Sequence, residues 1–431
     1  MDKILYFCKY NITNMKIYKF GGASVNSAEG VRNLQKIVGK EKGNLVIVVS
    51  AMGKITNALE KVVNSFFERR ADVTKNLQAV IDFHTTIVDE LFEDKTTITA
   101  ELKQLYDELK EIIQQKPSLS YDYDYDRIVS FGELISTTII ANFLKQENSA
   151  IQFVDIRAGI KTDDNYREGN VDMDLSQKLC DRLFAEREKK VFVTQGFIAG
   201  TITNQTTTLG REGSDYTAAI LANLLNADSV TIWKDVPGVM TADPKRYKEV
   251  QIIPKLSYKE AIELSYCGAS IIHPKTVKPL QNKKIPLFVK SFIEPDKDGS
   301  VINEYPYKLN LPPIYIDKSN QVLLTLTPRD FSFIAEEKLS KIFSVLASYR
   351  LKVSLMQTSA ISFSFCMDYN KVNFQQLVQE FKNEFEVLYN TDVELISIRH
   401  HTKEIIDKLV GEKIVFVEQR NRLTARFVVS E

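Results

Sequence analysis

Short runs of apolar, mostly β-branched residues recur along the first part of the chain, and amphipathic segments separate them. Continuous apolar runs are typical of strands that are buried on both faces, and the intervening segments have helical spacing. The pattern predicts an α/β fold with an open, mostly parallel sheet covered by helices on both faces, and with ligands at the carboxyl ends of its strands. The expected strands are Lys16–Phe20, Leu45–Ser50, Ile151–Asp155, Val191–Thr194, Ser229–Trp233 and Pro286–Val289.

The segment from Ile55 to Gln115 has a different pattern. It contains many charges and neither proline nor glycine. This composition predicts long helices packed beside the sheet, and a solvated helical insertion with no chemical role accounts for most of it.

The pattern changes again after the proline-containing stretch 306–313. From residue 321 the order strand, helix, strand, strand, helix, strand predicts a ferredoxin-like βαββαβ unit. Its expected elements are Val322–Thr327, Phe331–Tyr349, Leu351–Thr358, Ile361–Asp368, Asn373–Phe385 and Glu386–Tyr389. A second, truncated unit with a similar order of strands and a helix follows. Its expected elements are Val393–Ile398, Lys403–Val410, Ile414–Glu418 and Thr424–Val429. The predicted domains are an N-terminal extension 1–14, an α/β domain 15–300, a βαββαβ module 314–390 and a truncated module 391–431.

Composition narrows the class of protein. The chain has 431 residues, of which 44% are hydrophobic and 26% charged, as in soluble globular proteins of two or three domains. Lysine plus arginine equals aspartate plus glutamate at 56 each, so nucleic acid is not an expected partner. No apolar run approaches the roughly 20 residues that span a membrane. The four cysteines and four histidines have no metal-ligand spacing, which predicts reduced thiols, a cytoplasmic location and no metal site.

The segment Lys19–Val25, K-F-G-G-A-S-V, directly follows the first predicted strand. A strand that ends in a lysine and breaks into Gly21, Gly22 and the small residue Ser24 can bring backbone N–H groups and one cation against phosphate. Neither a G-x-x-x-x-G-K-[ST] loop nor a G-x-G-x-x-G fingerprint occurs. The motif therefore predicts a nucleotide site of another type.

Three later segments also combine glycine with charged residues. They are F-G-E-L at 131–134, T-T-T-L-G-R-E-G-S-D-Y-T-A-A at 206–219 and W-K-D-V-P-G-V-M-T-A-D-P-K at 233–245. With the first motif, they make the chain resemble aspartate kinases of the amino-acid-kinase superfamily followed by a pair of ACT regulatory modules. The resemblance implies a three-layer αβα sandwich and ATP-dependent phosphorylation of the side-chain carboxylate of L-aspartate. The product, 4-phospho-L-aspartate, leads towards lysine, threonine and methionine.

An aspartate side chain is already ionised at neutral pH, so its phosphorylation needs alignment and charge neutralisation rather than a general base. Lys19 is the best candidate to lie over the transferring phosphoryl group. The resemblance implies that Asp215 orients Lys19 and the amino acid. An acid in the first turn of a helix, favoured by the helix dipole, is the structural alternative for Asp215.

The resemblance also assigns the substrate contacts. Arg211 is expected to hold the α-carboxylate, and Glu133 the ammonium group. Ser50 and Thr56 match positions where the family lines the aspartate pocket with hydroxyls. The structural alternatives are a salt bridge for Arg211, a first-turn helix acid for Glu133 and helix-capping or strand-end hydroxyls for the other two.

The expected ATP loop follows the strand that ends at Trp233. By resemblance, Asp235 and Lys245 are the polar contacts to ribose and adenine. The chain departs from many relatives at Lys234, Met240, Lys245 and Ser270, where they carry threonine, an aromatic residue, arginine and lysine. ATP itself implies Mg²⁺ bridging its phosphates, and no carboxylate cage for a separate metal is visible.

ACT pairs usually bind a small amino acid and join two chains, so a homodimer with an amino-acid effector is expected. Lysine-sensitive relatives tend to carry an aspartate after the valine that matches Val353, whereas this chain has Ser354. Lysine inhibition is therefore not expected. Two rival functions remain: a kinase of the same fold acting on another small carboxylate or amino acid, and a non-catalytic amino-acid sensor.

Overall fold

The computed structural model describes residues 15–185, 190–269 and 272–431. The chain divides into two compact units. Unit 1 extends to Val239 and includes Ile252–Ile262 and Ile271–Leu309, whereas unit 2 comprises Met240–Gln251, Glu263–Ser270 and Asn310–Glu431. The predicted extension 1–14 lies outside the described residues, and the predicted domain boundaries stay predictions.

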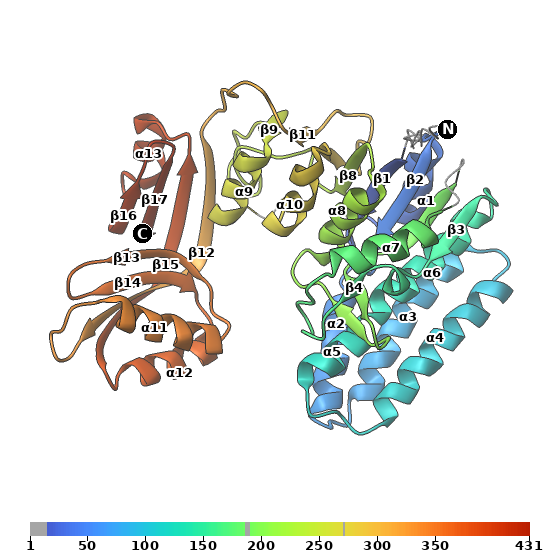
Figure 1. Cartoon of the computed structure of the whole chain (residues 1–431), viewed down its shortest axis with the longest axis horizontal. Coiled ribbons are helices and arrows are strands. Elements are labelled where there is room, and N and C mark those ends of the chain that lie inside the picture. Colours follow the sequence, from blue (N-terminus) through green and yellow to red (C-terminus); the bar gives the residue numbers. More distant parts are fainter. Residues whose placement is uncertain (1–14, 186–189, 270–271) are drawn as a thin grey trace, which may run out of the picture. The chain divides into compact units, whose positions relative to one another are not determined.

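The sheet of unit 1 contains all six predicted strands, which pair in parallel (Figure 1). Their order across the sheet is β3 (Ile151–Val154), β5 (Val191–Gln195), β2 (Asn44–Val49), β1 (Met15–Phe20), β8 (Ser229–Lys234) and β10 (Leu287–Ser291). Two short strands complete it: β11 (Ser300–Asn303), antiparallel to β10, and β9 (Lys255–Ser257). The prediction of a mostly parallel α/β sheet is confirmed. Because β1 and β8 pair in parallel, their carboxyl ends lie side by side.

Helices connect these strands and cover the sheet. The stretch 55–115 forms three helices, α2 (Ile55–Phe67), α3 (Val73–Leu91) and α4 (Thr96–Gln114). The other helices are α1 (Ala28–Gly39), α5 (Tyr121–Val129), α6 (Phe131–Lys145), α7 (Met173–Leu183), α8 (Gly213–Leu225), α9 (Tyr258–Cys267) and α10 (Pro274–Lys283). In α6 and α8 nearly every residue is buried, so these two helices belong to the core and their first turns are fixed against the sheet.

The helical stretch 121–145 is, within the described residues, long and apolar enough to cross a membrane by length and composition. However, 83% of its apolar window is buried inside the chain. A core helix passes the same test, and the burial of α6 accounts for its hydrophobicity.

A small three-stranded sheet was not predicted from the sequence. It consists of β4 (Lys161–Thr162), β6 (Ile198–Thr201) and β7 (Thr206–Thr208). These strands have only two to four residues each, which is too short for a periodic signal. The sheet matters because β7 leads into the segment that carries Arg211.

Unit 2 contains a six-stranded antiparallel sheet in the order β13-β14-β12-β15-β17-β16. The strands are β12 (Ile314–Pro328), β13 (Val353–Thr358), β14 (Phe363–Asp368), β15 (Phe385–Arg399), β16 (Ile414–Arg420) and β17 (Thr424–Ser430). The helices are α11 (Glu336–Ser348), α12 (Lys371–Phe381) and α13 (Lys403–Val410). The predicted βαββαβ order is present. Two predicted helices have wrong boundaries. The helix α11 begins at Glu336 rather than at Phe331, whose φ of 55° is not helical. The helix α12 ends at Phe381 rather than at Phe385, where β15 begins.

The two strands predicted at 386–389 and 393–398 form one long strand, β15, which pairs along its length with the long strand β12. The second half of β12 pairs with the first half of β15 in the βαββαβ module. The first half of β12, from Ile314 to Lys318, pairs with the stretch Leu395–Arg399 instead. The module that looked truncated in the sequence therefore receives a further strand from residues 314–318, which were predicted to belong to the first module.

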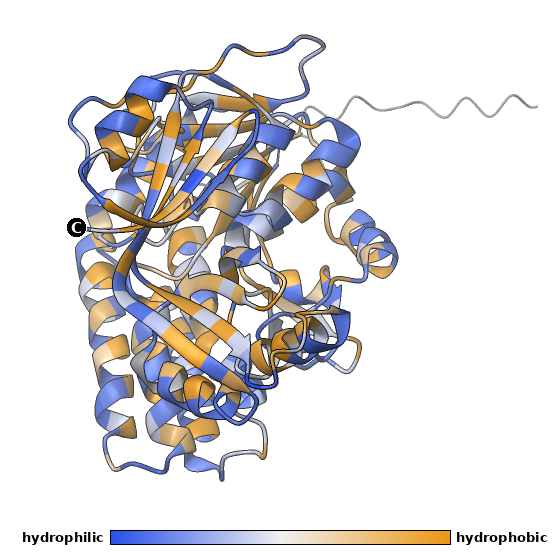
Figure 2. Cartoon of the chain, turned by 90° about the vertical axis from the view of Figure 1, so that its left-hand side faces the viewer, coloured by the Kyte–Doolittle hydropathy of each residue, from blue (hydrophilic) through white to orange (hydrophobic). Residues whose placement is uncertain are grey.

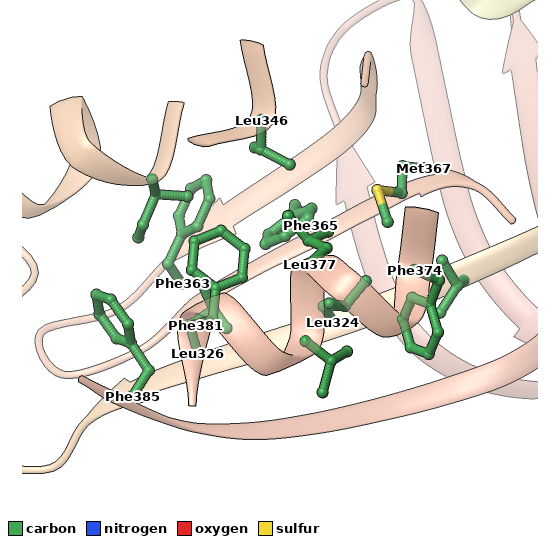
Figure 3. Close-up of a cluster of buried hydrophobic side chains, with 13 residues drawn as sticks. Leu324, Leu326, Leu346, Phe363, Phe365, Met367, Phe374, Leu377, Phe381 and Phe385 are labelled. Carbon is green, nitrogen blue, oxygen red and sulfur yellow. The ribbon is translucent and has the colours of Figure 1, made fainter. Parts of the chain in front are cut away.

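Hydrophobic side chains pack on both modules of unit 2. In the first module, Leu324, Phe363, Phe365 and Leu377 belong to a cluster between the strands and the helices α11 and α12 (Figure 3). In the second module the cluster includes Ile398 and Phe427 together with Ala242. Figure 2 shows hydrophilic and hydrophobic residues alternating along many helices, as expected for elements buried on one side.

Candidate active site

Three charged side chains meet at the carboxyl ends of two neighbouring strands in unit 1. Lys19 lies at the end of β1, Lys234 at the end of β8 and Asp215 in the first turn of α8. Lys19 Nζ is 2.7 Å from Asp215 Oδ1, and Lys234 Nζ is 3.6 Å from Asp215 Oδ2. Burial acts to raise the pKa of Asp215, but Lys19 and Lys234 outweigh it and hold the pKa below its usual value. The carboxylate therefore stays charged and holds two ammonium groups close together.

The glycine segment lies directly beside Lys19. A Cβ atom placed on Gly21 would be 3.3 Å from Lys19 Nζ, and one on Gly22 would be 2.7 Å from the carbonyl oxygen of Ala51. The second position therefore tolerates no side chain. The N–H of Gly53 donates to the carbonyl of Gly22 at 2.9 Å, which joins the segment to the loop after β2. Ser24 is buried in the same turn.

Glu133 lies in the first turn of α6 and is only 2% exposed. Its Oε1 accepts a hydrogen bond from the N–H of Ala51 at 3.0 Å, whereas its buried Oε2 has no hydrogen-bond partner among the described residues. Burial raises the pKa of Glu133 to about 8, against the opposing effects of hydrogen bonds and of the charge of Lys19. A buried carboxyl oxygen without a donor is costly, so a cationic ligand at this position would be favoured.

The raised pKa of Glu133 leads us to expect that kcat/KM for the amino-acid substrate depends on pH. At pH 7 the free protein holds this carboxyl mostly protonated, and an ammonium ligand needs it ionised. We expect kcat/KM for the amino-acid substrate to increase nearly tenfold per pH unit up to about pH 8, and then to level off. Glu133→Gln should lower kcat/KM and abolish this increase, whereas Glu60→Gln, the control on α2, should keep it. An unchanged pH profile in Glu133→Gln would contradict the assignment; steady-state rates from pH 6 to 8.5 provide the measurement.

The other expected substrate residues occupy the surrounding loops. Arg211 is exposed between Gly210 and Glu212, which both have positive φ, at 75° and 53°. It makes no hydrogen bond or ion pair with any described residue. Ser50 follows β2, and its carbonyl accepts from Ser136 Oγ at 2.8 Å. Thr56 lies half-buried in the first turn of α2.

The residues expected to bind the nucleotide belong to both units, and one of them lies outside the described residues. Lys234 belongs to the charged group described above, and Asp235 follows it at an exposed position. Met240 and Lys245 belong to unit 2, and Ser270 lies outside the described residues. Within the described residues, contacts join Lys19, Asp215 and Lys234, and the charge of Lys19 also acts on Glu133. The role of Asp235, Met240 and Lys245 in ATP binding stays a prediction.

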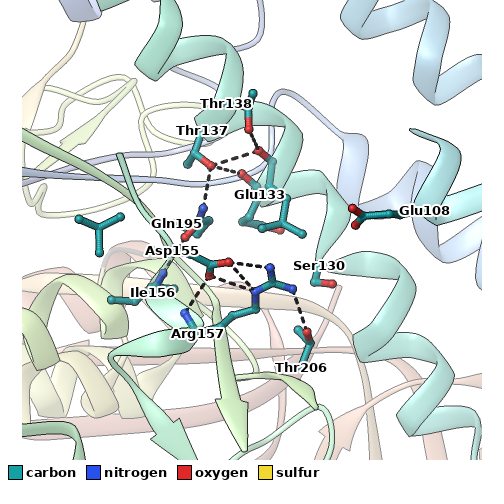
Figure 4. A network of polar contacts seen from close by, with 12 residues as sticks. Glu108, Ser130, Glu133, Thr137, Thr138, Asp155, Ile156, Arg157, Gln195 and Thr206 are labelled. Carbon is teal, nitrogen blue, oxygen red and sulfur yellow. Dashed lines mark hydrogen bonds and ion pairs between the residues drawn. The ribbon is translucent and has the colours of Figure 1, made fainter. Parts of the chain in front are cut away.

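Sequence patterns did not point to a polar network that supports Glu133 (Figure 4). Gln195, at the end of β5, donates through Nε2 to Thr137 Oγ1 at 3.1 Å and accepts the N–H of Ile156 at 2.9 Å. Thr137 Oγ1 in turn donates to the Glu133 carbonyl at 2.7 Å. The sequence alone does not show whether a glutamine at the end of a strand is buried or exposed. Gln195 thus fixes the first turns of α6 against the sheet.

Asp126 is a second buried residue that sequence patterns did not single out. Its Oδ2 accepts the N–H groups of Arg167 and Thr208, both at 2.8 Å, and its Oδ1 accepts from Thr208 Oγ1 at 2.7 Å. Burial raises its pKa to about 6, although these hydrogen bonds oppose the shift. Because β7 ends at Thr208, Asp126 holds the strand that leads to Gly210 and Arg211. Its only sequence signal is the unusual run Y-D-Y-D-Y-D at 121–126.

The arrangement matches a class of small-molecule kinases. The sequence profile of the amino acid kinase family matches residues 14–291. The chloroplastic aspartokinase 1 of Arabidopsis thaliana is 32% identical over 375 residues, which cover 84% of this chain and 65% of that protein. The lysine-sensitive aspartokinase 3 of Escherichia coli is 30% identical over 365 residues, covering 83% of this chain and 79% of that protein. This chain therefore belongs to the amino acid kinase family and, within it, to the aspartokinases.

Solved structures agree with this assignment. Two structures of E. coli aspartokinase III, one with lysine and aspartate and one with aspartate and ADP, match with a TM-score of 0.81 and 26% identity. They cover 97% and 96% of this chain, and this chain covers 96% of each of them. The aspartate kinase of Clostridium acetobutylicum matches with a TM-score of 0.74 at 22% identity, which supports the fold alone.

Proposed function

We propose that this chain transfers the γ-phosphoryl group of ATP to the side-chain carboxylate of L-aspartate, forming 4-phospho-L-aspartate and ADP. The observation that carries the proposal is the pair of ammonium groups, Lys19 and Lys234, held on Asp215 beside the buried carboxyl of Glu133. The E. coli relative, whose structure contains aspartate and ADP, supports the choice of substrates.

The charges of the site suit this reaction. An oxygen of the substrate carboxylate forms a bond to the γ-phosphorus while the bond from phosphorus to the β–γ bridging oxygen breaks, and ADP leaves with that electron pair. Both reactants are anions, so a cation held between them lowers the barrier. Lys19, oriented by its ion pair with Asp215, has this role. Glu133 binds the substrate ammonium and Arg211 its α-carboxylate, which distinguishes an amino acid from a simple dicarboxylate.

The nucleotide would enter as its Mg²⁺ complex. Among the described residues no group of three or more histidine, cysteine, aspartate or glutamate side chains could hold a metal ion. The ligands of such an ion come mostly from phosphate oxygens and water. When bound, Mg²⁺ neutralises charge on the β- and γ-phosphates.

The proposal extends to regulation and location. An amino-acid effector in unit 2, a homodimer and a cytoplasmic location all remain part of it. Ser354 Oγ accepts a hydrogen bond from Lys318 Nζ at 3.2 Å, so an ammonium group of the chain itself lies at the position where lysine-sensitive relatives carry an aspartate. This contact supports the prediction that free lysine does not inhibit this chain.

An assay for acyl phosphate tests the activity. Hydroxylamine converts an acyl phosphate to a hydroxamate, and we expect ATP-dependent hydroxamate formation with L-aspartate. L-glutamate, N-acetylglutamate and carbamate should give at most a few per cent of that rate, and UMP should give no ADP release above background. A preference for one of these compounds would identify a different kinase of the same fold. Absence of turnover with all of them, in folded protein that still binds aspartate, would favour a sensor.

A further inference from the structure

Two arginines are buried on one face of the second module of unit 2. Arg399, at the end of β15, is 5% exposed, and Arg426, on β17, is 8% exposed. In the antiparallel register Arg399 lies opposite Thr424, and Ser397 lies opposite Arg426. Residues opposite each other in a sheet point to the same face, so all four side chains share one face. The intervening residues Ile396, Ile398 and Phe427 face the hydrophobic cluster on the other side.

The hydrogen bonds of the two guanidinium groups differ. Arg399 Nη1 donates to Thr424 Oγ1 at 2.6 Å and lies 3.4 Å from Glu263 Oε2. Arg426 Nε donates to Ser397 Oγ at 3.2 Å, and its guanidinium lies 5.5 Å from the centre of the Tyr266 ring. Arg426 Nη2 is buried without a hydrogen-bond partner, and Arg426 forms no ion pair with any residue that the structure describes.

The surroundings do not neutralise Arg426. The acidic side chain of Glu263 is 41% exposed and pairs with Arg399 rather than with Arg426. Burial and, to a smaller extent, Asp368 raise the pKa of Cys366 to about 12, whereas Arg426 and Lys318 both act to lower it. Lys318 therefore adds another positive charge near this thiol. A buried guanidinium without a counter-ion is costly, and native proteins pair such charges. The unmatched charge indicates that an anion from solution completes this site.

The last turn of α9 marks where the anion would lie. Burial raises the pKa of the Cys267 thiol, although Arg426 and Arg399 both oppose the shift, so both charges lie close to this turn. Tyr266, which lies over Arg426, is itself 64% exposed. The site is therefore adjacent to solvent at the edge of α9.

We propose that unit 2 binds a small oxyanion, a carboxylate or a phosphate, through Arg426 with Arg399 beside it. A guanidinium presents two parallel N–H groups that match two oxygens of either anion. The hydroxyls of Ser397 and Thr424 accept from the two arginines and hold them in place. This inference does not depend on the proposed kinase activity.

Thermal unfolding of the full chain tests the inference. The protein is melted in chloride buffer, and then with sodium phosphate or sodium acetate added at matched ionic strength. At least one of the two anions should raise the melting temperature in a saturable way, by about 5 °C at roughly 100 times its dissociation constant. A rise with phosphate alone would identify a phosphate ligand, and a rise with acetate alone a carboxylate.

Substitutions distinguish a binding site from a structural arginine. Arg426→Met removes the unmatched charge, so it should melt at or above the parent temperature in chloride and show no anion-dependent rise. Arg420→Met, the control on β16, removes an exposed arginine paired with Glu418 and should keep the full rise. If Arg426→Met does not fold, Arg426→Lys carries the test and should lose more than half of the rise. A parent protein insensitive to both anions, or an undiminished rise in the Arg426 variant, would overturn the inference.

Discussion

Lys19→Ala is expected to lower kcat by about 10²- to 10³-fold, the loss typical of removing one preorganised charge-stabilising group. The aspartate concentration at half-maximal rate should change by no more than a few-fold. Lys19 Nζ is 2.7 Å from Asp215 and next to Gly21, but it makes no contact with Glu133, which is expected to bind the amino acid. The substitution therefore removes an interaction that is strongest in the transition state. Initial rates of ADP release at saturating substrates provide the measurement.

Folding has to be checked in the same experiment, because Lys19→Ala leaves the buried Asp215 with only Lys234 as partner. The melting temperature and circular dichroism of the variant show whether it is folded, and Lys19→Met keeps more of the side-chain volume. The control is Lys16→Ala on the same strand, where Lys16 pairs with Glu41 at 2.9 Å, away from Asp215. The control should keep its turnover. Folded Lys19 variants with turnover within a few-fold of the parent would refute the role of this lysine.

Arg211→Ala is expected to raise KM for aspartate about 100-fold while kcat at saturation falls by no more than about fivefold. A hydrogen-bonded charge pair of this kind contributes roughly 1.5–3 kcal/mol to binding. Arg211 has no ion-pair partner among the described residues and lies in the segment between β7 and α8, so its guanidinium is free to take a carboxylate. KM for ATP should stay within twofold. The measurement is a set of aspartate titrations at saturating ATP.

Two further variants test whether the expected change in KM comes from the forked geometry and the position of Arg211. Arg211→Lys keeps the charge but loses the forked geometry, so its KM for aspartate should fall between those of the parent and Arg211→Ala. Arg182→Ala, on the exposed face of α7, removes the same charge at a distance and should leave KM unchanged. If Arg211→Ala lost kcat at saturating aspartate and kept its KM, the arginine would belong to the phosphoryl-transfer step instead.

The helices and strands of the α/β unit were mostly predicted correctly from the sequence, whereas element boundaries set by contacts between distant residues were not. The six strands of the parallel sheet and the helical structure of residues 55–115 were predicted, because both are defined by continuous local patterns. The predicted boundaries at Phe331, Phe385 and Tyr389 were wrong. At Phe331 the backbone adopts positive φ, at Phe385 pairing with Pro328 of β12 already begins the strand, and at Tyr389 this pairing continues it. Pairing of this kind depends on residues far away in sequence, so no local pattern reveals it.

In the candidate active site, too, the positions of single residues were predictable from the sequence, and the contacts between them were not. Residue type and spacing placed Lys19 at a strand end and Asp215 and Glu133 in first turns of helices, and the motifs around them indicated a kinase. Only the fold brought Lys234 within 3.6 Å of Asp215 and left one buried oxygen of Glu133 without a partner among the described residues.

The parallel sheet, the charged residues at its edge and the family follow from the amino-acid sequence, because hydrophobic period and short motifs are local properties. Which of those residues touch depends on the three-dimensional fold. It also decided that Gln195 and Asp126 support the site, and that the second module of unit 2 takes a strand from residues 314–318. Burial and hydrogen bonding arise between segments distant in the chain, and they determine the pKa of Glu133 and the unmatched charge of Arg426.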